Sequence, residues 1–198
     1  MSSWLSGMWD WLSSLLKSIG LEEKSGKLLF IGLDNAGKTT LMGRLKSDLI
    51  DVHVPTLHPT SESLSLGGVN FTAFDLGGHA QVRRVWKDYY EAADGVVFLV
   101  DATDLERLPE ARAEIHSLLD DEAVAYMPIA IFGNKIDKGG ALSEADLQRH
   151  LGIDKICTGK VSCSPDYRPA RPLEVFMISV KNRQGYGEGI RWLAEYLD

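Results

Sequence analysis

The sequence predicts an α/β domain whose mostly parallel six-stranded sheet has one antiparallel edge strand and helices on both faces. Three observations predict it. The apolar run Leu28 to Ile31 leads directly into a glycine-bounded loop and a helix-like segment. Further apolar runs of strand length alternate with stretches of helical periodicity, as in βαβ units. The pair Gly67-Gly68 between two short strands predicts one antiparallel hairpin.

The loop after the first strand carries the clearest motif, because Gly32 to Thr39 spells G-x-x-x-x-G-K-T. In such a loop, backbone N–H groups and the following helix N-terminus surround an anion. Lys38 is expected to neutralise the β- and γ-phosphates, and the Thr39 hydroxyl is expected to bind Mg²⁺, which prefers oxygen ligands. The predicted nucleotide-binding residues of this loop are Asp34, Asn35, Ala36, Gly37, Lys38, Thr39 and Thr40.

The remaining elements follow in chain order. Strands are expected at Leu64 to Leu66, Val69 to Phe74, Gly95 to Asp101, Pro128 to Phe132 and Leu173 to Ile178. Helices are expected at Thr40 to Ser47, around Leu105 to Leu119, and at Ile190 to Leu197. Two connections are expected to be irregular: the stretch 151 to 172, read as a surface insertion, and the glycine-rich segment Arg183 to Gly189.

Two segments before the middle of the chain are expected to face the γ-phosphate. The loop Asp48 to Ser61 carries Thr56 and Thr60, and we choose Thr56 as the threonine that completes the Mg²⁺ shell when the γ-phosphate is present. The strand ending at Asp75 is followed by Leu-Gly-Gly-His. Asp75 is expected to reach the Mg²⁺ shell and the Gly78 N–H to bond the γ-phosphate. His79 is then placed to orient the attacking water as the catalytic residue.

The strand at Pro128 to Phe132 runs into Asn134-Lys135-Ile136-Asp137. Asp137 is expected to accept hydrogen bonds from N1–H and the 2-amino group of guanine, and adenine would leave this carboxylate unpaired. Asn134 is expected to brace the neighbouring loops, while the alkyl stem of Lys135 covers the base. Backbone N–H groups at Ser179 and Val180 are expected to meet the guanine oxygen.

Bulk properties narrow the class of protein. The 198 residues suffice for one domain with a substantial core. The net charge of −7, without a cluster of Lys and Arg, argues against a nucleic-acid partner. Cys157 and Cys163 are the only cysteines, so the expected state is two reduced thiols in the cytosol. No apolar run approaches the length that spans a bilayer, and Ser2 excludes N-myristoylation.

Residues 1 to 19 form a candidate membrane-inserting helix. On a helical wheel the apolar side chains fall within an arc of roughly 160°, and three tryptophans suit the membrane interface. These side chains are Trp4, Leu5, Met8, Trp9, Trp11, Leu12, Leu15, Leu16 and Ile19. The alternative is a terminal helix that packs on its own domain. Residues 20 to 26 are expected to be a linker, and 27 to 198 the nucleotide-binding domain.

Taken together, GLDNAGKT at 32 to 39, PT at 55 to 56, DLGGH at 75 to 79 and NKID at 134 to 137 resemble the motifs of Ras-like small GTPases. The amphipathic N-terminus before the first strand fits the Arf/Sar branch best. Within that branch the chain resembles the Sar GTPases, on the strength of His79, Ser2, the tryptophan-rich N-terminus, VPTLHPTSE and RQGYGEG. The resemblance implies a Ras-like fold over nearly the whole chain.

The resemblance also implies a function. A membrane-bound guanine nucleotide exchange factor would replace GDP by GTP, and residues 1 to 19 would then insert into the endoplasmic reticulum membrane. The inner complex of the COPII vesicle coat would be recruited there for transport from the endoplasmic reticulum to the Golgi. Acting as GTPase activator, it would supply an arginine finger in trans. The protein would be cytoplasmic with GDP and on the cytosolic face of that membrane with GTP, with some association with the Golgi.

The hairpin at 64 to 74 would link the two events, because in this branch it shifts register when GTP binds. A shift by an even number of residues is expected, because a slip of one residue would move every side chain to the opposite face of the sheet. Asp34, where Ras often has glycine, resembles the Arf/Sar pattern. No arginine lies between Asp48 and Ser63 to act in cis, so slow intrinsic hydrolysis is expected. The alternatives are a GTP-dependent scaffold with negligible hydrolysis and a small phosphate-loop kinase.

Overall fold

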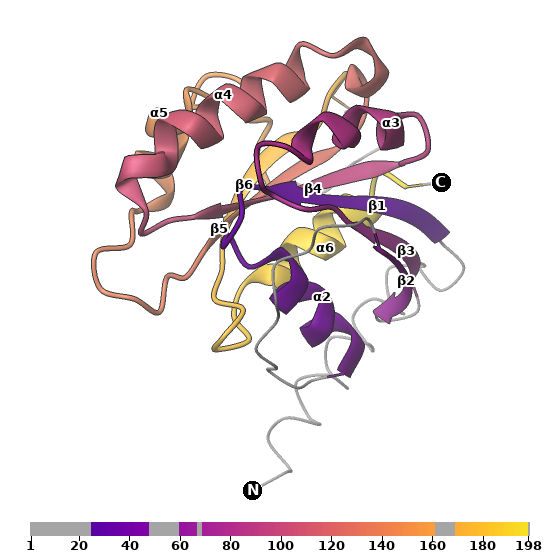
Figure 1. The fold of residues 1–198 in the computed structure, drawn as a ribbon, viewed down its shortest axis with the longest axis horizontal. Coiled ribbons are helices and arrows are strands. Elements are labelled where there is room, and N and C mark those ends of the chain that lie inside the picture. Colours follow the sequence, from indigo (N-terminus) through magenta and orange to yellow (C-terminus); the bar gives the residue numbers. More distant parts are fainter. Residues whose placement is uncertain (1–24, 48–59, 67–68, 161–168, 198) are drawn as a thin grey trace, which may run out of the picture.

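A six-stranded sheet forms the centre of the protein (Figure 1). The computed structural model describes residues 25–47, 60–66, 69–160 and 169–197. The strands are β1 (Ser25–Gly32), β2 (Thr60–Leu66), β3 (Val69–Asp75), β4 (Gly95–Asp101), β5 (Ile129–Asn134) and β6 (Leu173–Met177). Their order across the sheet is β2-β3-β1-β4-β5-β6, and only the β2–β3 pair is antiparallel. The predicted fold class is therefore confirmed.

β1 lies in the interior of the sheet, between β3 and β4. Its run Leu28 to Ile31 is almost fully buried, as expected for a parallel strand covered on both faces. In register, Phe30 pairs with Asp75 of β3 and with Val97 of β4. The carboxyl ends of these strands therefore lie at one edge of the sheet, where loops from different parts of the chain meet.

Helices cover both faces of the sheet (Figure 1). α2 (Lys38–Ser47) and α6 (Tyr186–Ala194) lie on one face, and α3 (Lys87–Tyr90), α4 (Leu108–Leu119) and α5 (Glu144–Leu151) lie on the other. Each face has its own apolar core against the sheet. Short 3₁₀ turns occur at Arg83–Trp86, Leu105–Arg107 and Glu122–Val124.

α5 was absent from the sequence-based prediction. It is short and polar, and the side chains that it buries most deeply are Leu147 and Leu151. Its ends are well defined. The Ser143 hydroxyl accepts a hydrogen bond from the Asp146 N–H, and Gly152 ends the helix in the left-handed conformation (φ 68°). A single pair of apolar positions gives too weak a periodicity to predict a helix, so the caps were the usable signal.

Several helix and strand boundaries in the structure differ from the predicted ones. Thr60, expected in the loop, begins β2 and pairs with Asp75, so it is a strand residue. The last helix was expected at Ile190 but begins at Tyr186, directly after Gly185 at φ 83°. The segment Arg183 to Gly189 is therefore only partly a connection. β1 begins at Ser25, inside the stretch expected to be a linker.

The predicted irregular insertion is also partly ordered against the sheet edge. Thr158 exchanges hydrogen bonds with Leu173 of β6 through both its backbone and its hydroxyl. The Gly159 N–H donates to Glu174, a carboxylate that is only 3% exposed. Residues 157 to 159 thus run along the outer strand.

Within the described ranges no helix combines the length and the apolar character that a membrane crossing requires. The predicted amphipathic helix at 1 to 19, with its membrane-facing side chains, lies outside the described residues, and so does Thr56.

Candidate functional site

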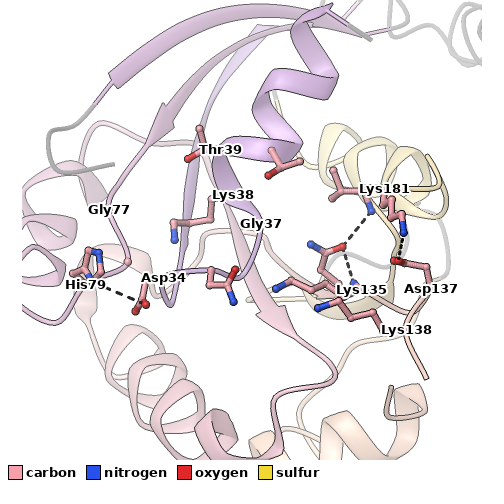
Figure 2. Close-up of a pocket in the computed structure, with 15 residues that line it drawn as sticks. Asp34, Gly37, Lys38, Thr39, Gly77, His79, Lys135, Asp137, Lys138 and Lys181 are labelled. Atoms are coloured by element: carbon pink, nitrogen blue, oxygen red, sulfur yellow. Dashed lines mark hydrogen bonds and ion pairs between the residues drawn. The ribbon is translucent and has the colours of Figure 1, made fainter. Parts of the chain in front are cut away.

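A cavity of about 360 Å³ lies at the carboxyl edge of the sheet (Figure 2). Its volume is in the range of small-molecule and cofactor sites. Four segments meet there: the loop between β1 and α2 with the start of that helix, the residues after β3, the residues after β5, and the residues after β6. The lining residues are Asp34, Asn35, Gly37, Lys38, Thr39, Thr40, Gly77, Gly78, His79, Asn134, Lys135, Asp137, Lys138, Val180 and Lys181.

The loop between β1 and α2 is closed by hydrogen bonds from Lys38, the first residue of α2. Lys38 Nζ donates to the carbonyl oxygens of Gly32 and Leu33, each at 2.9 Å, and the side chain is buried. Asn35 and Gly37 adopt positive φ values of 62° and 101°. A Cβ on Gly37 would lie 2.4 Å from the Asn134 amide nitrogen, so only glycine fits there without a shift. The ammonium is therefore held in place by the carbonyl groups of a tight loop, beside the pocket that it lines.

Asn134 joins three loops of the pocket. Its Nδ2 donates to the Ala36 carbonyl at 2.9 Å, and its Oδ1 accepts from the N–H groups of Lys135 (2.8 Å) and Val180 (3.2 Å). Only 3% of Asn134 is exposed. One side chain therefore ties the phosphate loop to the loops after β5 and β6.

Asp137 is oriented from the loop after β6. The Ser179 hydroxyl donates to Asp137 Oδ1 at 2.6 Å, and Ser179 Oγ also accepts from the Asn182 N–H. Lys181 Nζ lies 3.9 Å from Asp137 Oδ2. The hydrogen bond from Ser179 is the main cause that lowers the pKa of Asp137, so the group is an ionised acceptor at neutral pH.

Lys135 is held by a residue that the motif did not indicate. Its Nζ lies 2.6 Å from Asp101 Oδ2, at the end of β4. The other oxygen of Asp101 accepts from the N–H and hydroxyl of Thr103. Burial acts to raise the pKa of Asp101, but the hydrogen bonds from Lys135 and Thr103 outweigh it and lower the pKa. The aliphatic part of Lys135 is thus fixed beside the pocket.

At the other end of the pocket, Gly77 and His79 lie near Asp34 of the phosphate loop (Figure 2), and Gly78 lines the pocket between them. A Cβ on Gly78 would lie 2.2 Å from the Asp34 backbone nitrogen and 2.6 Å from Lys38 Nζ, so the two segments are in close contact. The His79 side chain is 45% exposed, and its Nδ1 lies 4.0 Å from Asp34 Oδ2. The imidazole is therefore open to solvent at the mouth of the pocket.

Asp34 is also paired with an arginine that the sequence reasoning did not find. Arg107 Nη2 donates to Asp34 Oδ1 at 2.8 Å. This hydrogen bond is the first cause that lowers the pKa of Asp34. Arg107 ends the 3₁₀ turn directly before α4, and Glu110 lies in the first turn of α4. No motif spacing relates either residue to Asp34. Only their proximity in the folded structure identifies Arg107 as the partner of Asp34.

The residues present fit a Mg²⁺ ion bound together with a nucleotide. Thr39 brings a hydroxyl to the pocket directly after Lys38, and Asp75 ends β3 opposite Phe30, beside the strand that enters the phosphate loop. Within the described residues no group of three or more His, Cys, Asp or Glu side chains is placed to hold a metal. Mg²⁺ at nucleotides needs no such group, because phosphates and waters supply most of its oxygens.

Most of the predicted site residues come together in this pocket. Of the predicted residues that the structure describes, Ala36, Asp75 and Ser179 do not line it. Ala36 and Ser179 are buried, and Asp75 stands at the end of β3. Ala36 contributes the carbonyl that Asn134 binds, and Ser179 contributes the hydroxyl that orients Asp137. Lys138 and Lys181 line the pocket but were not predicted as site residues.

Comparison with known proteins agrees with this geometry. The ADP-ribosylation factor family model matches residues 12–197. The chain is 44% identical over 191 residues to the small COPII coat GTPase SAR1 of Giardia intestinalis, covering 96% of this chain and 100% of the relative. It is 42% identical to SAR1 of Nicotiana tabacum, covering 95% and 98% of the two chains. A solved structure of the Arl6 BBS3 small GTPase from Trypanosoma brucei with the bound nucleotide analogue GppNp superposes with a TM-score of 0.74 at 30% identity, covering 86% of this chain and 96% of that one. The chain belongs to the ADP-ribosylation factor family of small GTPases.

Proposed function

We propose that this protein is a Sar-type GTPase switch whose GTP-bound form recruits the COPII coat. The observation that carries the proposal is the convergence of the phosphate loop, the Gly78-His79 segment and Asp137 on one cavity of about 360 Å³. The lysine-rich lining suits a polyphosphate, and Asp137 supplies an ionised acceptor for the guanine edge. Adenine lacks the 2-amino group and would leave Asp137 without a donor.

Hydrolysis would take place at the end of the pocket formed by Lys38 and His79. Lys38 binds the β- and γ-phosphates, the Gly78 N–H bonds the γ-phosphate, and His79 orients the attacking water. Thr39, Thr56 and Asp75 would hold Mg²⁺, which neutralises charge on the phosphates when bound. Because His79 is 45% exposed, water reaches it easily in this arrangement, and an activator that covers the site would be needed for fast turnover.

The output would be membrane attachment. Residues 1 to 19 would insert through Trp4, Leu5, Met8, Trp9, Trp11, Leu12, Leu15 and Leu16 when GTP binds, with residues before β1 as the connection to the GTPase domain. The partners would be a membrane-bound exchange factor and the inner coat complex, with an arginine finger in trans. The expected location is the cytoplasm with GDP and the endoplasmic reticulum membrane with GTP. The names of the SAR1 relatives support this assignment.

The first test concerns base selection. Fluorescent GDP is displaced from the full-length protein by GTP or by ATP. Displacement by GTP alone supports the assignment, whereas equal displacement by ATP would favour the kinase interpretation and overturn it.

The second test concerns hydrolysis. His79→Gly is compared with the wild type and with His150→Ala, which changes an exposed histidine of α5. GTP hydrolysis in the presence of coat proteins should fall by about 10²-fold or more in His79→Gly, with GTP affinity within about threefold of the wild type. An unchanged rate would show that His79 is not the catalytic residue, and no hydrolysis in any form would favour the scaffold.

A further inference from the structure

The carbonyl groups of Gly77 and Gly78 are held by side chains from the turn that follows them. Trp86 Nε1 donates to the Gly77 carbonyl at 3.0 Å, and Arg83 Nε donates to the Gly78 carbonyl at 2.7 Å. Both donors are buried, with Trp86 2% and Arg83 8% exposed. Two successive peptide groups of the segment that faces the γ-phosphate are therefore fixed in orientation.

These two bonds also orient the N–H groups on the other side of each peptide. In a trans peptide the C=O and N–H point in opposite directions, and the described residues contain no cis peptide. The bond from Trp86 thus directs the Gly78 N–H away from the core, and the bond from Arg83 fixes the peptide plane that carries His79. Gly78 and His79 are the two residues to which the proposed function gives roles at the γ-phosphate.

Arg83 is in turn held by α4. Its Nη1 donates to Glu114 Oε1 at 2.8 Å and its Nη2 donates to Glu110 Oε1 at 2.7 Å. Every nitrogen of the guanidinium therefore has a partner of fixed position. Burial acts to lower the pKa of Arg83, but the hydrogen bonds to Glu114 and Glu110 outweigh it and raise the pKa, so the group stays charged.

Glu110 extends the connection to the phosphate loop. Its second oxygen, Oε2, accepts from Arg107 Nε at 2.9 Å, and Arg107 donates to the carboxylate and carbonyl of Asp34. One carboxylate on α4 thus bridges the arginine that holds Gly78 and the arginine that holds the phosphate loop. α4 is a common anchor for the two segments that surround the γ-phosphate.

We propose that Arg83, anchored by Glu110 and Glu114, is a positioning residue that sets the Gly78–His79 segment for the γ-phosphate. It acts through the Gly78 carbonyl and does not itself touch the nucleotide. GDP lacks the γ-phosphate, so its binding depends much less on this anchor, although Arg83 Nη2 also lies 3.9 Å from Asp34 Oδ1 of the phosphate loop. The inference rests on the proposed function, because it assumes that the pocket binds GTP and GDP.

The test compares dissociation of fluorescent GDP with that of fluorescent GppNHp from the full-length protein. Arg83→Lys keeps the charge but cannot reproduce the forked set of three bonds, and Glu114→Gln weakens one bond while leaving Arg83 in place. Arg84→Lys, an exposed neighbour, is the control. In Arg83→Lys, GppNHp should dissociate about tenfold faster, the loss expected for one hydrogen bond from a charged donor, with GDP dissociation within about twofold of the wild type. Glu114→Gln should shift the same ratio by a smaller factor.

A second readout separates positioning from general loosening. If Arg83 acts through His79, its effect on GTP hydrolysis disappears when His79 is already glycine, so the two substitutions are strongly non-additive. Equal acceleration of GDP and GppNHp dissociation, no change in either, or additive effects with His79→Gly would each overturn the inference. Should Arg83→Lys not fold, Glu114→Gln gives the same comparison. A wild-type protein that binds neither nucleotide would instead refute the proposed function.

Discussion

Removing the side chain of Asn134 should weaken both the fold and the nucleotide site. Asn134→Ala deletes three hydrogen bonds, to the Ala36 carbonyl and from the N–H groups of Lys135 and Val180. A typical bond contributes about 1 kcal/mol net, and more when a buried partner is left unsatisfied. Because Asn134 is 3% exposed, we expect a loss of about 3 kcal/mol in the free energy of unfolding. For a chain of this size that corresponds to a fall in Tm of about 6–12 °C.

The assay is thermal unfolding of the GDP-bound protein followed by circular dichroism. Bound GDP itself stabilises the fold, so each variant is melted with GDP at the same multiple of its own Kd, which makes the contribution of binding equal. The control is Asn182→Ala, because Asn182 is exposed and its hydrogen bond to Ser179 comes from the backbone N–H. A fall in Tm below about 2 °C for Asn134→Ala, or the same fall in both variants, would refute the assigned role.

Three further experiments test two other parts of the site and the outer edge of the sheet. In Gly78→Ala the new Cβ would lie 2.2 Å from a backbone nitrogen of the phosphate loop, so the Gly78–His79 segment must move away. GppNHp affinity should then fall by about tenfold or more in a fluorescence titration, while GDP affinity changes less. Asp101→Asn weakens the 2.6 Å ion pair with Lys135 and should speed GDP release by roughly tenfold in a stopped-flow assay; an unchanged rate would contradict this role. Burial raises the pKa of the Cys157 thiol to about 12, so in a Cys163→Ser background iodoacetamide should label folded protein at pH 8.5 far more slowly than unfolded protein. As the pH rises, the Cys157 thiol of the unfolded chain loses its proton before the buried thiol of the folded chain does. The contribution of the raised pKa to the free energy of unfolding is therefore complete below about pH 8.5, and it declines as the pH rises toward 12.

Much of the fold was predictable because its signals are local. The apolar run Leu28 to Ile31 has strand length, and the glycine loop that follows it is typical of the turn between a buried strand and a helix. α5 was missed because it buries few apolar side chains, and its caps were the only local signal. The start of α6 was misplaced because Gly185 reads as a loop residue, although its positive φ serves to begin the helix.

The pocket was predictable where its residues follow a motif. Lys38, Asn134 and Asp137 occur at fixed spacing from a strand end, so their chemistry could be inferred from the chain. Arg83 and Arg107 could not, because their partners on α4 and in the phosphate loop are set by how α4 packs across the sheet. Arginine and glutamate on a helix usually indicate a solvated face, and only the fold distinguishes a buried network from that case.

In the proposed switch, this chain binds membranes when it holds GTP and not when it holds GDP. The most direct measurement is flotation of the full-length protein with neutral liposomes, loaded with GDP in one sample and GppNHp in the other. The control is the pair of substitutions Leu12→Asp and Leu16→Asp on the predicted apolar face. We predict that GppNHp-loaded wild type floats with the liposomes, while the GDP form and the substituted chain remain in solution. Equal flotation of the GDP and GppNHp forms, or flotation of neither, would contradict the switch.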